Sequence, residues 1–292
     1  MPSTAPNNTA PSEPSDFVDT IDGCKSLVEG LLNAVPKDTS RNISIGVDCE
    51  GVNLGREGEL CILTIATQTR VSLIDITTLG AAAFSDGLLH KLLSHHRIDK
   101  YFYDCRQDAD ILNAHYGVKL SNVVDLQYSA CMHFGVRREY LMGLRKALEQ
   151  MECATAEERR TKDEGARLFS PELGGSYDNW KARPLNRLLV QYSIVDVKYF
   201  FLLARMTQKF EREARIVGAM RVRRAEAPGF RPAIDGSADW LNMPGLQDHM
   251  LPSYDEQDPH MQQHHHHLQF QQQQHQLFQM QQWQQQQADF FY

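Results

Sequence analysis

The cysteines of this sequence lack the spacings of a zinc site or a disulfide framework. Its 292 residues contain six cysteines, at positions 24, 49, 61, 105, 131 and 153. None belongs to a C-x-x-C pair, and none stands at zinc-ligand spacing from a histidine. Several fall inside predicted strands or helices. We therefore expect reduced thiols in the core of a cytosolic or nuclear protein.

Long apolar runs, a signal sequence and a basic excess are also missing. No apolar stretch approaches the length of a membrane-spanning helix. Residues 1–16 are rich in Pro, Ser, Thr and Asn, without the basic and apolar regions of a secretory signal. The net charge of −7 gives no overall attraction to nucleic acid, although local patches and bound metals decide binding at a site. We expect an intracellular protein, nuclear or cytoplasmic, with no membrane partner.

Composition divides the chain into one globular domain and its flanks. A hydrophobic content of 42% suffices for one α/β domain and hardly for two. Residues 1–16 are predicted to be disordered, and the domain is predicted over residues 17–215. An irregular linker is expected over 216–261, before a Gln/His-rich low-complexity tail over 262–292. We interpret the histidines at 264–267 as part of this low-complexity tract and not as a metal site.

Short apolar runs bounded by turn residues predict a mixed β-sheet flanked by helices, an α/β fold. The predicted strands lie at residues 43–49, 60–67, 71–76, 100–103 and 123–126. The first three have short connections, which favours an antiparallel meander. The alternation of the later strands with helices indicates that helices pack on the sheet.

Helical periodicity supplies the predicted helices. An amphipathic helix is expected over residues 17–35, capped by Ser15 or Asp16. Another is expected over residues 107–116, closed by Gly117. Pro184 is expected to open one long helix that runs to about residue 215. The charged segment between residues 136 and 183 shows only short helical pieces and no recognisable motif.

Asp48 and Glu50 stand at the end of the first predicted strand of the meander. Side chains alternate faces in a strand, so both carboxylates project from one face and Cys49 from the other. Neighbouring carboxylates repel each other, and a divalent cation is the usual compensation. The alternative interpretation is a solvated strand end.

Further acidic residues stand at the ends of other elements. Asp108 lies at a strand-to-helix junction, where it would also suit the helix dipole. Tyr192 and Asp196 are four residues apart on the long helix and share a face, which is equally typical of an exposed helix surface. Asp125 is interpreted as the N-cap of the helix that follows it.

Three segments, in this order, resemble the three motifs of the DEDD 3′–5′ exonucleases. They are GVDCEGVNLGR (residues 46–56), CRQDADIL (105–112), and WKARPL (180–185) followed by YSIVD (192–196). The third has the tyrosine-bearing, DEDDy form. The likeness covers about residues 17–210 and is closest to the branch with RNase D, Werner-type exonuclease domains and Egalitarian-like proteins.

The resemblance implies an RNase H-like (DnaQ-like) fold and a site for two Mg²⁺ or Mn²⁺ ions. The implied ligands are the carboxylates of Asp48, Glu50, Asp108 and Asp196. Tyr192 would position the attacking water, and Asp104 is a rival to Asp108 in the second motif. Both ions prefer oxygen ligands, which suits this set. The implied activity removes nucleoside 5′-monophosphates from a single-stranded 3′ end, with RNA slightly favoured over DNA.

Two alternative functions remain open, and the residues that bind the substrate are a separate hypothesis. Some Egalitarian-like relatives lack the carboxylates, so a nucleic-acid-binding adaptor with little or no turnover is the alternative. In a third hypothesis, the glutamine-rich tail carries the function and the folded domain serves as a docking module in an assembly. The phosphates of the substrate could be bound by a basic strip along the end of the long helix, or by Arg183 and Arg187, which lie nearer the predicted site. The competing interpretation of the strip is a solvated helix end. The strip comprises Lys209, Arg212, Arg215, Arg221, Arg223 and Arg224.

Overall fold

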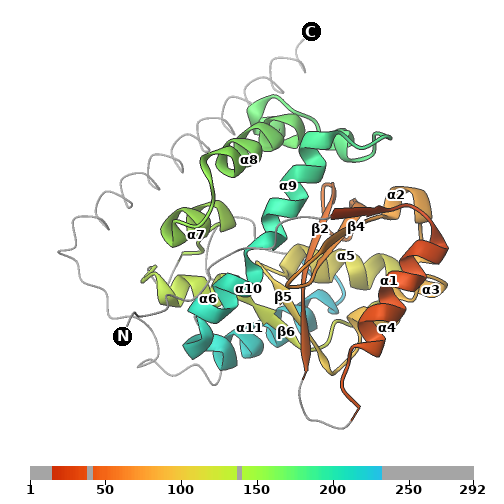
Figure 1. The fold of residues 1–292 in the computed structure, drawn as a ribbon, viewed down its shortest axis with the longest axis horizontal. Helices are drawn as coiled ribbons and strands as arrows, with labels where there is room; N and C mark the ends of the chain where they lie inside the picture. The colour runs from red at the N-terminus through yellow and green to blue at the C-terminus, as the bar shows by residue number, and fades with distance from the viewer. Residues whose placement is uncertain (1–14, 38–41, 137–139, 232–292) are drawn as a thin grey trace, which may run out of the picture. The chain divides into compact units, whose positions relative to one another are not determined.

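The computed structural model describes residues 15–37, 42–136 and 140–231. Three of its strands form the antiparallel meander that the short connections predicted (Figure 1). They are β2 (Ile43–Val52), β3 (Glu59–Ala66) and β4 (Val71–Asp75). The N-terminal segment before residue 15, the later part of the predicted linker and the Gln/His-rich tail with its histidines lie outside the described residues.

The remaining strands extend the meander on both sides. β5 (Ile98–Phe102) runs parallel to β2, and β6 (Val123–Asp125) runs parallel to β5. Among the described residues the sheet has the order β1-β4-β3-β2-β5-β6. Parallel and antiparallel neighbours occur in one sheet, and the predicted α/β fold of the RNase H-like type is confirmed.

The start of the domain differs from the prediction. Ser15–Val18 form strand β1, which pairs with β4 in parallel at the edge of the sheet. Helix α1 therefore spans Ile21–Asn33, and the side chain of Thr20 caps it by accepting a hydrogen bond from the N–H of Gly23. The expected helix start at residue 17 was wrong because Phe17 and Val18 fit an edge strand, and Thr20 supplies the N-cap.

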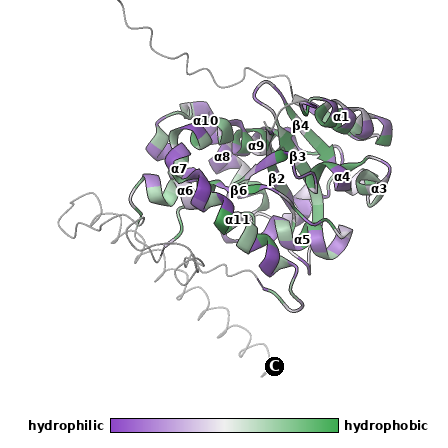
Figure 2. Cartoon of the chain, turned by 90° about the horizontal axis from the view of Figure 1, so that it is seen from below, coloured by the Kyte–Doolittle hydropathy of each residue, from purple (hydrophilic) through white to green (hydrophobic). Residues whose placement is uncertain are grey.

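Helices cover both faces of the sheet and divide the core into two main clusters. The first cluster lies under α1, α3 (Ala82–Ser85), α4 (Leu89–Leu93) and α5 (Arg106–Tyr116). The second lies under α6 (Leu126–His133), α9 (Arg187–Lys198) and α10 (Phe200–Met206). Figure 2 shows β3 and β4 as mainly hydrophobic and the surrounding helices with hydrophilic outer positions. The helix α5 ends at Gly117 in the left-handed conformation, as predicted.

The single long helix expected after Pro184 is instead a series of shorter helices. α9 begins at Arg187, where the side chain of Asn186 accepts a hydrogen bond from the N–H of Leu188. The chain leaves helical geometry at Tyr199 and again at Thr207. α11 (Glu211–Ala225) then packs against β6 and continues well beyond the predicted domain end at residue 215. Residues 216–225 therefore belong to the domain and not to a linker.

The described part of the segment without a recognisable motif, residues 140–183, forms helices, and the longest of them packs beside α9 (Figure 1). Its main element is α8 (Ala156–Phe169), which begins with a capping box between Thr155 and Glu158. The segment also contains α7 (Leu144–Met151) and the 3-10 turns η1 (Pro171–Leu173) and η2 (Tyr177–Trp180). Two short elements lie elsewhere in the chain: α2 (Ile76–Leu79) follows β4, and the 3-10 turn η3 (Gln208–Phe210) precedes α11. None of the six cysteines is paired in a disulfide; five are buried, and Cys153 is partly exposed. In the part of the chain that the structure describes, no helix combines the length and apolarity needed to cross a membrane.

Candidate active site

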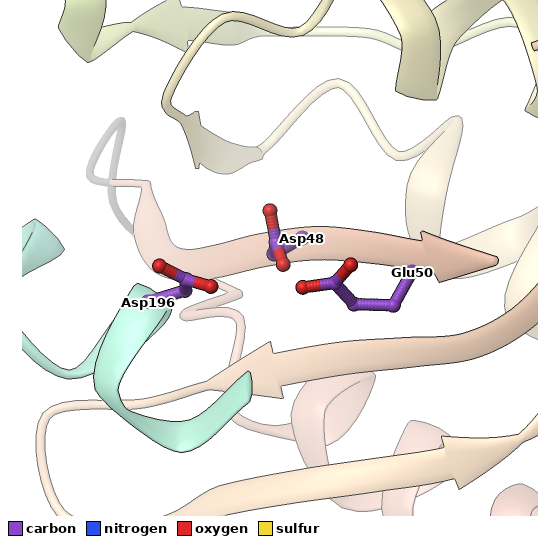
Figure 3. A group of neighbouring side chains, drawn as sticks. All are labelled: Asp48, Glu50 and Asp196. Atoms are coloured by element: carbon purple, nitrogen blue, oxygen red, sulfur yellow. The ribbon is translucent and has the colours of Figure 1, made fainter. Parts of the chain in front are cut away.

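Three of the predicted site carboxylates meet between the sheet and α9. Asp48 and Glu50 come from β2, and Asp196 comes from α9 (Figure 3). One carboxylate oxygen from each lies within 4.8 Å of the others. Residues about 150 positions apart in the sequence thus present oxygens to one small volume.

The strand geometry explains the position of the first pair. Asp48 and Glu50 occupy alternate positions of β2 and both line a cleft of about 630 Å³. The side chain of Cys49 between them belongs to the core cluster under α1 and α5. Tyr192 and Asp196, one helical turn apart on α9, line the same cleft from the other side. The predicted alternation on β2 and the shared face of α9 therefore both hold.

Asp108 lies in the same cleft but is tied to the backbone of β2. Its Oδ1 accepts a hydrogen bond of 2.9 Å from the N–H of Cys49. The pairing of β2 with β5 ends at Gly46, so this N–H has no strand partner on that side. Asp108 thus joins the first turn of α5 to the strand that carries Asp48 and Glu50. It is not one of the three carboxylates that the 4.8 Å cluster contains.

The cluster has the electrostatics of a cation site. Burial, followed by the charges of Glu50 and Asp196, raises the pKa of Asp48 well above its ordinary value, and burial does the same for Glu50. Burial raises the pKa of Asp108 to about 7, against the opposing hydrogen bonds from Cys49. The Oδ2 atom of Asp48 is buried and has no hydrogen-bond partner among the described residues. An all-oxygen donor set with an unsatisfied buried oxygen fits Mg²⁺ or Mn²⁺.

Asp104, the alternative to Asp108 in the second motif, forms ion pairs with arginine side chains. Its carboxylate accepts two hydrogen bonds of 2.6 Å from Arg106, and Arg221 lies 3.3 Å away. Burial acts to raise the pKa of Asp104, but these guanidinium groups outweigh it and hold the pKa below its usual value. Asp125 caps α6 by accepting from the N–H of Gln127, as predicted. Asp104 is therefore neutralised by arginine and has less need of a metal ion.

One residue of the site, Lys162, could not be predicted from the sequence, and it lies at the Asp196 side of the acidic cluster. This residue of α8 is almost buried, and its Nζ is paired with Oδ1 of Asp196. The same Nζ lies 3.2 Å from the centroid of the Tyr192 ring. Its positive charge lowers the pKa values of Asp48 and Glu50 against the larger effects of burial and neighbouring acids. The charged surface pattern of α8 contains many basic residues, and nothing in it distinguishes position 162.

Aromatic side chains also line the cleft that contains the acidic cluster. Phe169, Tyr177, Trp180 and Tyr192 all line it. The ring of Tyr192 meets those of Phe169 and Trp180 edge to face, with centroids 5.1 and 6.2 Å away. Such an arrangement fixes the tyrosine ring and offers apolar surface next to the carboxylates. The motif at residues 180–185 had indicated Trp180, but not this contact.

The predicted basic strip is not a continuous surface. Arg221 has no exposed side-chain area and forms a 2.8 Å ion pair with Asp125. Arg215 is bound to Asp99 and Glu211. The strip prediction was wrong for these two residues because acidic groups on β5, β6 and α11 use them in packing. Near the cleft, Arg183 is likewise paired, with Asp75, and Arg187 is exposed.

Comparison with known proteins agrees with this geometry. A family profile described as 3′–5′ exonuclease matches residues 16–214 of the chain. The piRNA biogenesis protein EXD1 of Mus musculus is 42% identical over 92 residues, which are 32% of this chain and 16% of that protein. The protein of the same name from Bombyx mori is 32% identical over 111 residues, 38% of this chain and 33% of that protein. The matched region is thus a third or less of these relatives.

Solved structures share the fold. RNase D of Trypanosoma brucei in complex with GMP superposes with a TM-score of 0.61 at 24% identity, covering 76% of this chain and 66% of that chain. Its complex with RNA U12 gives a TM-score of 0.60 at 22% identity, covering 79% and 75%. RNase D of Escherichia coli gives 0.56 at 18% identity, covering 74% and 51%. These likenesses concern the arrangement of the elements.

Proposed function

This chain belongs to the 3′–5′ exonuclease family, and from that membership we propose that it is a divalent-metal-dependent nuclease acting on single-stranded 3′ ends. The observation that carries the proposal is the convergence of Asp48, Glu50 and Asp196 within 4.8 Å. The buried, unpartnered oxygen of Asp48 supports it, because a cation would satisfy that atom. The products would be nucleoside 5′-monophosphates and a strand shortened by one residue.

The proposed reaction is hydrolysis of the terminal phosphodiester. A water oxygen bonds to phosphorus, the bond from phosphorus to the 3′ oxygen of the preceding nucleotide breaks, and that oxygen takes a proton. When bound, two Mg²⁺ or Mn²⁺ ions supply charge stabilisation for the entering and leaving oxygens and acidify the attacking water. Asp48, Glu50, Asp108 and Asp196 are the residues that would hold them.

Tyr192 is proposed to orient the attacking water and not to remove its proton. Burial, followed by the charge of Asp196, raises the pKa of its phenol well above the ordinary value. A phenol with so high a pKa keeps its proton at neutral pH and acts as a hydrogen-bond donor or acceptor. Contacts with Phe169 and Trp180 hold its ring in the cleft. The hydroxyl therefore has a fixed position relative to the carboxylates.

RNA is the proposed substrate class, ahead of DNA. Support comes from the names of the similar proteins: EXD1 is described as a piRNA biogenesis protein, and an RNase D of this fold was solved with RNA U12. The cleft itself supports an unpaired terminal nucleotide, because Tyr177 and Phe169 offer aromatic surface beside the acidic residues. A duplex end would have to open before its last base reached these rings.

A ladder assay on matched RNA and DNA strands tests the proposal. Purified protein is incubated with Mn²⁺ and 5′-labelled single strands of identical sequence. The expected result is stepwise shortening from the 3′ end, faster for RNA, and none for Asp48→Ala. Equal digestion by the wild type and Asp48→Ala would show that the activity arises elsewhere.

A nucleic-acid-binding adaptor with weak turnover is the second candidate. The observation that favours it is the pairing of Lys162 with Asp196, because an ammonium group there opposes a metal ion at the same oxygen. Under this alternative the protein binds single strands in Mn²⁺ without shortening them. The ladder assay, run beside a filter-binding measurement on the same strands, separates the two candidates.

A further inference from the structure

A positive side chain of the protein itself stands among the carboxylates of the proposed metal centre. Lys162 Nζ contacts Asp196 Oδ1, and the Lys162 and Asp196 side chains keep only 10% and 7% of their surface exposed. The same ammonium lies over the ring of Tyr192. No other lysine or arginine is paired with the three clustered acids among the described residues. Lys162 is therefore the local counter-charge of the site.

Close packing between α8 and α9 holds Lys162 in this place. Gly165, one turn further along α8, lies so near Tyr192 that an added Cβ would stand 2.7 Å from Cδ2 of the ring. At the start of α8, Glu158 accepts hydrogen bonds of 2.6 Å from Lys198 and 2.8 Å from the hydroxyl of Tyr199. These contacts fix the register of the two helices. The ammonium is consequently directed at Asp196 by the fold and not by a flexible loop.

A cation site and an ammonium group compete for the same oxygen. A metal ion bound at Asp196 would meet the charge of Lys162 at contact distance in a site of low dielectric, which is strongly unfavourable. Without a metal ion, removal of Lys162 would leave buried carboxylates facing one another. The two cations therefore stabilise alternative states of one cluster.

We propose that Lys162 is a resident counterion that occupies the Asp196 side of the site, and that a divalent ion must displace it to bind there. The proposal rests on the proposed metal-dependent function. It assigns to Lys162 the role of a positioning residue that sets the metal concentration at which the site fills. In the metal-free protein, Lys162 keeps the acidic cluster assembled.

A second cleft beside the acidic cluster could accommodate the Lys162 side chain after its displacement. Lys162 lines a second cleft, of about 500 Å³, which shares Tyr192 and Asp196 with the first. Asp163, whose carboxylate pairs with Arg145, lines this second cleft. A lysine side chain has four rotatable methylene bonds and reaches new acceptors without backbone movement. Rotation into the second cleft would keep the ammonium near water and a carboxylate.

Metal binding, measured without any substrate, tests the proposal. Mn²⁺ binding to the full chain is followed by calorimetry or by the loss of free-ion paramagnetic resonance signal, for the wild type, Lys162→Met and Lys162→Gln. Both variants are expected to bind Mn²⁺ about tenfold more tightly, since a competing charge is gone. Arg160→Met is the matched control, because it removes one positive charge from an exposed position of α8 and should leave the affinity unchanged.

Thermal unfolding gives the second readout. In EDTA, Lys162→Met is expected to unfold at a lower temperature than the wild type, and saturating Mn²⁺ should remove or reverse that difference. A variant that folds only in the presence of Mn²⁺ would also support the proposal. Unchanged or weaker Mn²⁺ binding by both Lys162 variants would overturn it, as would the absence of any binding to all four proteins.

The two proposals fail in different ways. Tighter Mn²⁺ binding by Lys162→Met, together with no strand shortening by the wild type or the variant, supports the counterion and overturns the nuclease. Equal Mn²⁺ affinity, together with strand shortening by the wild type, supports the nuclease and overturns the counterion.

Discussion

Arg221 Nη1 lies 2.8 Å from Asp125 Oδ2, and neither side chain has any exposed surface. Asp125 also accepts hydrogen bonds from the N–H groups of Cys105 and Gln127. One buried carboxylate thus connects α11 with the starts of α5 and α6. Asp108 lies in the first turn of α5, so this ion pair helps to position Asp108. Neither Arg221 nor Asp125 belongs to the acidic cluster.

Replacement of Arg221 should destabilise the fold. Arg221→Met leaves the Asp125 charge buried and uncompensated, which is expected to lower the free energy of unfolding by about 3–5 kcal/mol. Arg223→Met is the control: this neighbour on α11 is exposed, and its removal should change stability by less than about 0.5 kcal/mol. Chemical denaturation measures both. Similar losses from the two variants would contradict a special role for the buried pair.

The sequence predicted the acidic site because its members follow local periodicity. Asp48 and Glu50 alternate along a strand, and Tyr192 and Asp196 are one turn apart on a helix, so each pair shares a face whatever the surroundings. The order of the three motifs then placed the pairs in one known type of fold. The meander, the Gly117 cap and the Asp125 cap were likewise readable from nearby residues.

What the sequence did not reveal depends on tertiary contact. Lys162 lies in a helix with many charged residues, and the packing of α8 on α9 buries Lys162 among them. Arg221 resembled its exposed neighbours Arg223 and Arg224, yet the approach of α11 to β6 buries it. The start of α1 was misplaced because Phe17 fits a helix and an edge strand equally well.

Tyr192→Phe should separate water positioning from metal binding. The variant keeps the ring that packs on Phe169 and Trp180 and loses only the hydroxyl. We expect hydrolysis to slow by about a hundredfold, a magnitude typical of a positioned acid–base or orienting group, while Mn²⁺ affinity stays at the wild-type value. Single-turnover rates and Mn²⁺ titrations provide the two readouts. A wild-type rate for the variant would remove the hydroxyl from the mechanism.

Gly165→Ala should disturb the contact between α8 and Tyr192. An added Cβ would lie 2.7 Å from Tyr192 Cδ2, so the ring or the helix has to move, at a cost of about 1–3 kcal/mol. The expected result is lower stability together with slower hydrolysis. Gly30→Ala in α1 is the matched control, because nothing lies within 4 Å of its added Cβ. That change should stabilise the protein by about 0.5–1 kcal/mol; equal effects at both glycines would contradict the packing argument.

Glu158 gives a dependence of stability on pH. Burial acts to raise its pKa, but hydrogen bonds from Lys198, Thr155 and Tyr199 outweigh it and lower the pKa from its ordinary 4.5 to about 2. Because folding lowers the pKa of Glu158, its ionised carboxylate stabilises the folded state at pH values above the pKa of the unfolded chain. This stabilisation is lost as the pH falls from about 4.5 to about 2.

Glu158→Gln should therefore be less stable than the wild type near neutral pH, by about 0.5–1 kcal/mol, because the amide keeps the capping hydrogen bonds with Thr155 but loses the ion pair with Lys198. The difference should shrink as the pH falls below about 4.5. Urea unfolding at several pH values measures this, with Glu164→Gln, an exposed position of the same helix, as the control. A difference that is constant across the acidic range would show that Glu158 is not held ionised by its partners.

If the carboxylates on β2 and α9 form a metal-dependent hydrolytic site, the protein should release the last nucleotide of a strand only when a divalent ion is present. A single-stranded RNA carrying a label in its 3′-terminal nucleotide is incubated with the wild type, Asp48→Asn and Asp196→Asn, in Mn²⁺ and in EDTA. We expect the wild type to release labelled nucleoside 5′-monophosphate in Mn²⁺ but not in EDTA, and we expect neither variant to release it. Release in EDTA, or wild-type release by both variants, would contradict a metal-dependent site at these carboxylates.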